Sequence, residues 1–179
     1  MFLFDLLFGS KRNVPVRVPV MAAAEVPLDK GVSAPGTRIH YDSELITSLK
    51  DDHGALLSNF TAIVAAEKAG DLLTVQNLLG QFQTMIQDHL LKENVRLYVY
   101  LEHLLENDLV SHKMMHDFRH EMDSIGRAVV GFLTKYRQIS VRPELAATFA
   151  TDLGGIGEAL VARIKREEGI LYPMYSPPN

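Results

Sequence analysis

Apolar residues recur at intervals of three and four along the chain from about residue 42 to residue 171. This spacing places them on one face of an α-helix, and no segment alternates between apolar and polar residues as a strand does. Breaks at "KAGD", "ENDL" and "RQISVRPE" divide the pattern into four stretches. The pattern therefore predicts four long amphipathic helices, over about residues 43–69, 72–105, 110–136 and 144–171.

The breaks carry residue types that begin and end helices. Asp42 or Ser43 can accept a hydrogen bond from the first turn of the first helix. Gly70 suits a left-handed cap at the end of that helix, and Asp71 suits the N-cap of the next. Pro143 blocks continuation of the third helix. Long helices with short connections predict an all-α fold, an up-down-up-down four-helix bundle.

The first 37 residues have a different character. Proline and glycine recur there, at Pro15, Pro19, Pro27, Gly31, Pro35 and Gly36. We expect an extended, Pro-rich N-terminal arm over residues 1–37 and a bundle domain over residues 38–175. The apolar start, "MFLFDLLFGSKRN", is too short to span a membrane and lacks the features of a signal peptide. It is interpreted either as a poorly packed segment or as a strip that docks on a protein partner or a membrane surface.

The composition excludes several classes of site and partner. The chain is 47% hydrophobic and 22% charged, as expected for a soluble globular protein, and its net charge of −4 gives no basic field for nucleic acid. It contains no cysteine, which excludes disulfides, thiolate zinc sites, iron–sulfur clusters and a cysteine nucleophile. A cytoplasmic location is expected. No phosphate loop or nucleophile–base pair is recognisable, so the sequence specifies no enzymatic reaction.

Ionisable residues interrupt the apolar faces of three predicted helices. They are His53 on the first helix, His89 and Glu93 on the second, and Glu167 on the fourth. Burying such groups without a partner costs several kcal/mol. His and Glu four residues apart converge on one point, and imidazole with carboxylate suits iron, manganese or zinc. We expect a metal site inside the bundle. The alternative is that these residues bond to one another or reach water at a bundle end.

The third helix offers two further candidate ligands, Glu121 and His120. If the second and third helices are antiparallel about Asn107, residues 121–125 lie level with His89 and Glu93. Glu121 also lies closer to the apolar face than His120 does. Geometry therefore favours Glu121, with His120 as the alternative. His112 and His116 are expected at the surface.

These residues resemble the hemerythrin-like family, also called the HHE cation-binding domain, over about residues 40–173. The resemblance rests on "LITSLKDDHGALL" around His53, "HLLKE" from His89 to Glu93, and "RIKREEGILYP" near the end. It implies non-haem iron, as two ions or one, with Glu93 and Glu167 able to bridge. It also implies binding of O2, NO or iron itself, in sensing, storage or stress response. The family spacing allows His120 as a ligand.

The sequence departs from the family pattern at Arg163, because the family has a histidine four residues before the position of Glu167. Arginine has no lone pair to offer a metal. The alternative function is therefore a helical interaction module, in which Arg163 fills a degenerate site by pairing with Glu93 or Glu167 and the N-terminal segment docks a partner or membrane. An oligomer is compatible with either function. A di-iron oxidase or reductase is a third possibility, for which the sequence specifies no substrate.

Overall fold

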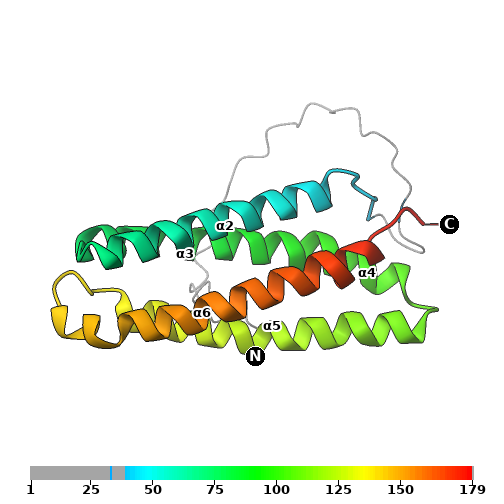
Figure 1. The fold of residues 1–179 in the computed structure, drawn as a ribbon. Helices are drawn as coiled ribbons and strands as arrows, with labels where there is room; N and C mark the ends of the chain where they lie inside the picture. The colour runs from blue at the N-terminus through cyan, green and yellow to red at the C-terminus, as the bar shows by residue number, and fades with distance from the viewer. Residues whose placement is uncertain (1–32, 34–38, 179) are drawn as a thin grey trace, which may run out of the picture.

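The computed structural model describes residue 33 and residues 39–178 (Figure 1). Except for residue 33, the predicted arm over residues 1–37 lies outside the described part of the chain. Residues 39–178 are helical without strands, and four long helical segments lie side by side as a bundle. In Figure 1, successive segments run in opposite directions along the bundle.

The first segment is α2, Leu45–Lys68. The second comprises α3 (Leu72–Lys92), a π-helical turn η1 (Glu93–Tyr98) and α4 (Val99–Leu104). The third is α5, Leu109–Tyr136. The fourth begins with a 3-10 turn η2 (Pro143–Leu145), continues as α6 (Ala146–Arg166), and ends with a π-helical turn η3 (Glu167–Leu171) and a 3-10 turn η4 (Tyr172–Met174).

Most helix ends lie at the residues that the sequence predicted. Gly70 adopts a φ of 71°, the left-handed conformation that ends α2, and Asp71 accepts a hydrogen bond from the Thr74 N–H as the N-cap of α3. The start of α2 differs from the prediction. Glu44 occupies the N-cap and makes no side-chain cap bond. Asp42 instead lies two residues earlier, where it accepts from the Glu44 N–H and pairs with Arg96.

The apolar faces form two clusters that occupy different lengths of the bundle. One extends from Leu56 and Leu90 towards the end that carries Ile139 and Phe149. The other gathers around Leu49, Leu97 and the C-terminal turn. Between them, the inward positions of α2, α3 and α6 carry polar side chains. This polar level is therefore closed off by hydrophobic packing on both sides.

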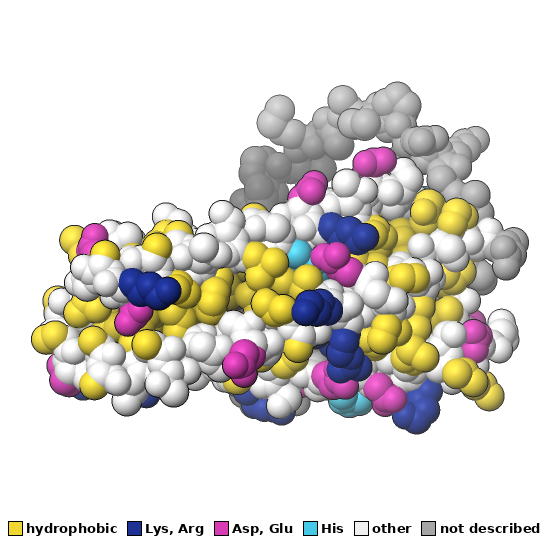
Figure 2. Space-filling view, in the orientation of Figure 1, with side chains coloured by type: hydrophobic (Ala, Val, Ile, Leu, Met, Phe, Trp, Pro, Cys, Tyr) yellow, Lys and Arg dark blue, Asp and Glu magenta, His cyan; other side chains and the backbone are white. Residues whose placement is uncertain are grey.

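Figure 2 shows hydrophobic side chains along the seam between α2 and α6, flanked by charged ones. Within the part of the chain that the structure describes, Pro143–Met174 is the one stretch long and apolar enough by composition to cross a membrane. It contains α6, which packs on α2 and α5 and carries the buried Arg163 and Glu167. In this structure the stretch serves as a bundle helix.

Candidate metal centre

Five ionisable side chains meet in the polar level of the bundle, and all are nearly inaccessible to solvent. α2 supplies His53, α3 supplies His89, and η1 begins with Glu93. α6 supplies Arg163, and η3 begins with Glu167. None of the five is more than 4% exposed. Because charged groups are rarely fully buried without partners, the interactions among these five side chains decide what the site can do.

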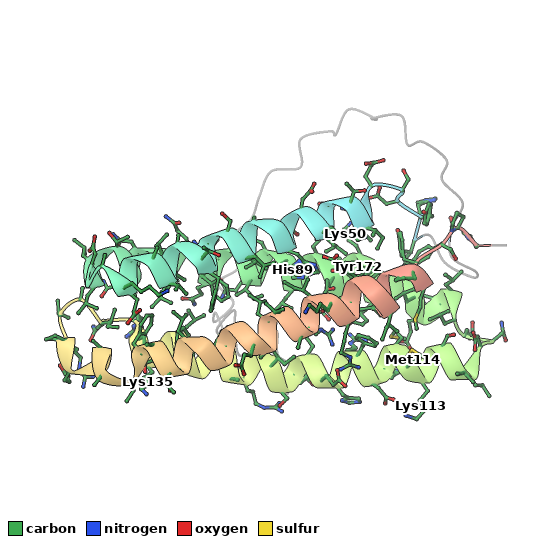
Figure 3. All side chains as sticks on the ribbon, in the orientation of Figure 1. Lys50, His89, Lys113, Met114, Lys135 and Tyr172 are labelled. Carbon is green, nitrogen blue, oxygen red and sulfur yellow. The ribbon has the colours of Figure 1, made fainter. Side chains whose placement is uncertain are left out.

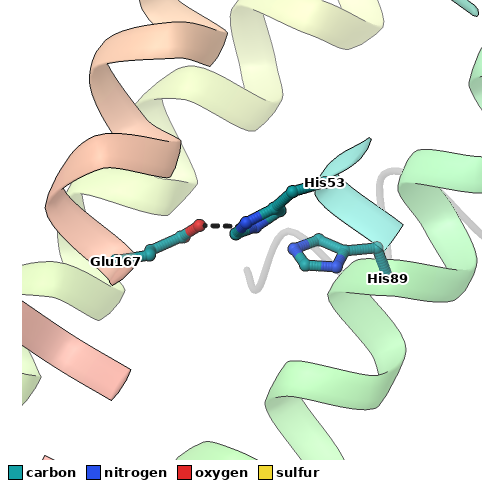
Figure 4. A group of neighbouring side chains, drawn as sticks. All are labelled: His53, His89 and Glu167. Carbon is teal, nitrogen blue, oxygen red and sulfur yellow. Dashed lines mark ion pairs between the residues drawn. The ribbon is translucent and has the colours of Figure 1, made fainter. Parts of the chain in front are cut away.

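Three of them place potential ligand atoms around one point. His53, His89 and Glu167 each offer an atom within 4.8 Å of the other two (Figure 4). The Nε2 of His53 lies 3.1 Å from Oε2 of Glu167, and the two imidazole rings have centroids 4.7 Å apart. Two imidazole nitrogens and a carboxylate oxygen form a donor set that suits iron, manganese or zinc.

Glu93 supplies a further oxygen beside this group. Its Oε1 accepts a hydrogen bond of 3.1 Å from the Tyr172 hydroxyl. Its Oε2 is buried, finds no hydrogen-bond partner among the described residues, and lies 3.8 Å from Nε2 of His89. A buried oxygen without a partner is costly, and a cation in this position would satisfy it. The residues present therefore fit a bound metal ion.

Carboxylates behind the two imidazoles orient them. The Nδ1 of His53 lies 2.8 Å from Oε1 of Glu168, and the Nδ1 of His89 lies 3.4 Å from Oδ2 of Asp52. Lys92 holds Asp52 through an ion pair of 2.6 Å. A carboxylate at Nδ1 favours the proton on that nitrogen, so Nε2 is the atom that would give up its proton, and direct its lone pair inward, when a cation binds. Both histidines are thus arranged as ligands that bind through Nε2.

Arg163 lies where the family pattern has a histidine, and each of its three guanidinium nitrogens donates a hydrogen bond. The Nε–H donates to Oε1 of Glu167. One terminal nitrogen donates to the carbonyl of Phe118 over 2.9 Å, and the other donates to the Tyr98 hydroxyl over 2.9 Å. The group also lies 5.0 Å from the centroid of the Phe118 ring. The expected pairing of Arg163 with a site carboxylate is thus observed with Glu167.

The two buried carboxyl groups differ in their electrostatic environment. Burial, reinforced by the neighbouring Glu167 carboxylate, raises the pKa of Glu93 well above its usual range. Burial also disfavours ionisation of Glu167, but the hydrogen bond with His53 and the charge of Arg163 outweigh it and lower the pKa of Glu167. Without a cation, the favoured state has an ionised Glu167 paired with Arg163 and a neutral Glu93.

Two tyrosines connect the halves of the site. The Tyr172 hydroxyl, from the fourth segment, lies 3.2 Å from Nε2 of His53 and donates to Glu93. Tyr98, from the second segment, accepts from Arg163 of the fourth. Each tyrosine follows a buried glutamate by five residues, across a π-helical turn. The Tyr172 hydroxyl is a donor within the site.

The structure does not bring the third-helix candidates into the centre. At this depth α5 turns Phe118 and Met122 inward. Glu121 has a side chain that is 42% exposed and pairs with Arg166, and it reaches the centre only through Arg163, whose terminal nitrogen lies 3.7 Å from its Oε2. His120 is exposed. The expectation that either residue faces His89 and Glu93 is therefore corrected, because the apolar residues beside them take the inward positions. His112 and His116 lie at the surface, as expected.

Sequence reasoning missed the residues that orient the site, chiefly Asp52, Lys92 and Glu168. For Asp52 and Glu168 the signal was present as acidic residues next to predicted ligands, in "DDH" and "REEG". They lie on the flank of each helix stripe, where a polar residue usually faces water. A search for a partner to each ligand's second nitrogen would have singled them out.

A small cavity of about 20 Å³ adjoins the centre. His53, His89, Arg163 and Glu167 line it on one side, and apolar side chains that include Phe82, Ile86 and Leu160 line the rest. A volume of this size holds about one water-sized molecule. The arrangement can therefore accept a very small ligand next to a cation, in surroundings that exclude bulk water.

Comparison with known proteins agrees with this geometry. The family model described as "Hemerythrin HHE cation binding domain" matches residues 44–175. No curated protein and no solved structure matches the chain significantly. The matched range contains all four bundle segments and every residue of the buried centre. The chain thus belongs to the hemerythrin HHE cation-binding domain family.

Proposed function

We propose that this protein binds a single iron ion in the buried centre and uses it to bind a small diatomic molecule, O2 or NO, in sensing or stress response in the cytoplasm. His53, His89 and Glu167 would hold the ion, with Glu93 completing the protein ligands. The observation that carries the proposal is the convergence of three ligand atoms within 4.8 Å, beside the unpartnered Oε2 of Glu93.

The single ion follows from Arg163. A second ion needs ligands of its own, and Arg163 offers none. Its guanidinium is held by Glu167, Phe118 and Tyr98, so it cannot swing away without breaking three hydrogen bonds. Its positive charge also repels a second cation in a medium where charges interact strongly. We infer that the guanidinium replaces the second cation of a dinuclear centre as the partner of Glu167.

The surrounding residues prepare the site for a small neutral ligand. A bound iron ion would supply an open coordination position for a diatomic molecule. The adjoining cavity admits a molecule of that size, and its apolar lining disfavours anions and bulk water. The hydroxyl of Tyr172, buried between His53 and Glu93, donates its one proton to Glu93 and so orients that carboxyl group beside the proposed ion. No residue on the cavity wall points to turnover of a larger substrate.

Metal analysis of the full chain, expressed with iron and purified without chelator, tests this function. We expect one iron per chain in the wild type. We expect the same iron content in a variant that lacks the surface histidines His112 and His116. We also expect an optical and electron-spin-resonance change on addition of NO, lost in His53→Asn. Less than a tenth of an equivalent of iron, or two equivalents, would contradict the proposal.

The competing function is the interaction module with a metal-free site, which the Arg163–Glu167 pair favours. Thermal unfolding separates the two. A cation that binds only the native chain raises the melting temperature in proportion to its occupancy. If iron, manganese and zinc all leave the melting temperature of the wild-type chain unchanged, the module is the better description. Docking of a protein partner or membrane by residues 1–37 remains part of that second proposal.

A further inference from the structure

A second cluster of metal-binding side chain types lies at the other side of α5, outside the buried centre. Glu102 is in the short helix α4, and His112 and His116 are one turn apart near the start of α5. The residues between the two histidines include Lys113 and Met114, which Figure 3 labels on α5. The cluster lies across the corner at which the chain passes from α4 to α5.

The three side chains point at one another. The Nε2 of His112 lies 3.1 Å from Oε1 of Glu102, and the Nε2 of His116 lies 3.3 Å from the same oxygen. The two imidazole rings have centroids 4.8 Å apart. One ligand atom from each residue lies within 4.8 Å of the other two. All three side chains are between 29% and 41% exposed, so the point where they meet is open to solvent.

These distances match a tetrahedral metal site. Zinc binds imidazole nitrogen and carboxylate oxygen at about 2.0–2.1 Å, so two ligands of one tetrahedral ion lie about 3.3 Å apart. The two observed nitrogen–oxygen distances are close to this separation. A hydrogen bond alone does not need both histidines, because either ring would satisfy the same carboxylate oxygen. Two histidines aimed at one carboxylate oxygen are better explained by a shared ligand.

The backbone around the cluster is fixed without a metal. Asp108 caps α5, accepting from the N–H groups of Val110 and Ser111. Met115 and Phe118, on the same turns of α5, are buried in the apolar core. Lys113 pairs with Asp117 and is not paired with the cluster. The histidines are thus presented by a rigid helix, which lowers the entropy cost of binding an ion.

We propose that Glu102, His112 and His116 bind a zinc ion at the surface, with water in the remaining position, and that the ion clamps α4 to α5. This site is independent of the buried centre. It contains two imidazoles, one carboxylate and an open position, whereas the buried centre is enclosed and adjoins Arg163. Its effect is to secure the corner between the second and third helical segments.

Zinc titration of the full chain by calorimetry, with the bound zinc counted, tests the proposal. The double variant His112→Asn/His116→Asn is expected to bind one zinc fewer than wild type. Glu102→Gln should weaken the surface site by at least about tenfold, which corresponds to about 1.4 kcal/mol. The matched control is His120→Gln, since His120 is one turn further along α5 and exposed. It should bind zinc as wild type does.

The difference in zinc count does not depend on whether the buried centre is filled, so this proposal and the proposed function can fail separately. All the substituted residues are at least partly exposed, and the variants should fold as wild type does. An equal count in wild type and the double variant would overturn the site. So would loss of zinc in His120→Gln with binding retained in Glu102→Gln, because the ion would then belong to a simple His116–His120 pair.

Discussion

Arg163 and Glu167, one turn apart on the fourth helical segment, form an ion pair inside the bundle in which neither side chain is more than 3% exposed. The arginine makes this possible by placing its remaining donors on Phe118 and Tyr98. An ion pair at this depth is costly to disrupt from one side, because the partner is left as an isolated buried charge.

Replacing Arg163 with leucine is therefore expected to lower the free energy of unfolding by about 3–5 kcal/mol. Urea unfolding of the metal-free chain measures it. Arg166→Leu is the matched control, since Arg166 is one turn away, 46% exposed and paired with Glu121. That exposed pair is worth about 0–1 kcal/mol. An equal decrease in the free energy of unfolding of the two variants would show that the buried ion pair stabilises the protein no more than the exposed one does.

Arg163→His tests whether Arg163 limits the buried centre to one iron ion. The substitution removes the buried positive charge and supplies a neutral nitrogen four residues before Glu167, which is the spacing that His89 and Glu93 already have. We expect the iron content to rise above one per chain. Arg163→Gln is the control, because it removes the charge without adding an imidazole. If the histidine variant still binds one iron ion per chain, a feature other than Arg163 limits the number of bound ions.

Asp52 is expected to control metal affinity without touching the ion. Its carboxylate lies behind Nδ1 of His89, and Asp52→Asn weakens the group that fixes the orientation of this ring. Loss of such an outer partner typically lowers metal affinity by about 10–100-fold. Competition with a chelator measures the affinity. Asp51→Asn, at the exposed neighbouring position, should leave it unchanged. Equal effects of the two substitutions would point to net charge as the cause.

The seam between α2 and α6 depends on a close approach at Gly157. A Cβ at this position would lie 2.6 Å from Cζ of Phe60, whereas one at Gly154 would have nothing within 4 Å. Both glycines are inside α6, where alanine gains about 0.5–1 kcal/mol over glycine. We expect Gly154→Ala to stabilise the protein and Gly157→Ala to be less stable than Gly154→Ala by about 1–3 kcal/mol. Thermal unfolding gives the ranking, and an equal gain would mean that Phe60 moves aside freely.

Asp152 should contribute stability that disappears in acid. Hydrogen bonds from Lys135 and then Tyr136 lower the pKa of Asp152 in the folded state. A depressed folded-state pKa gives a contribution that is complete above the unfolded value, about 3.9, and is lost as the pH falls through the folded-state value. Asp152→Asn is therefore expected to reduce unfolding stability at neutral pH, with a smaller reduction in strong acid. A reduction independent of pH would assign the effect to packing.

The helices could be predicted from sequence because their apolar stripes are long and regular, and the bundle follows from burying four such stripes together. His53, His89, Glu93 and Glu167 were found because each interrupts a stripe, and the structure places all four in one buried level. That these residues bind metal stays a prediction. The third helix was harder. An estimate from ideal rotation and an assumed pairing point favoured Glu121, but the adjacent Met122 takes the inward position and Glu121 stays partly exposed.

Most contacts of Arg163 could not be predicted from the sequence either. Pairing with a carboxylate could be anticipated, but the Phe118 carbonyl and the Tyr98 hydroxyl depend on the depth at which α5 and η1 pass the fourth segment. Such depths depend on side-chain packing between helices, which helix periodicity does not specify.

The two π-helical turns each hold one residue more than an α-helix would need between the glutamate and the tyrosine that face the site. In an α-helix a residue five positions after a glutamate points about 140° away from it, since each residue turns the chain by about 100°. The wider turns at Glu93–Tyr98 and Glu167–Leu171 bring the following tyrosines back towards the centre. Deleting one residue inside the first turn, such as the exposed Val95, would leave Tyr98 four positions after Glu93, which is about 40° away in an α-helix and still on the side of the centre. A deletion between His89 and Glu93 has no such spare residue, since it would turn Glu93 by about 100° relative to His89 and separate two of the proposed ligands.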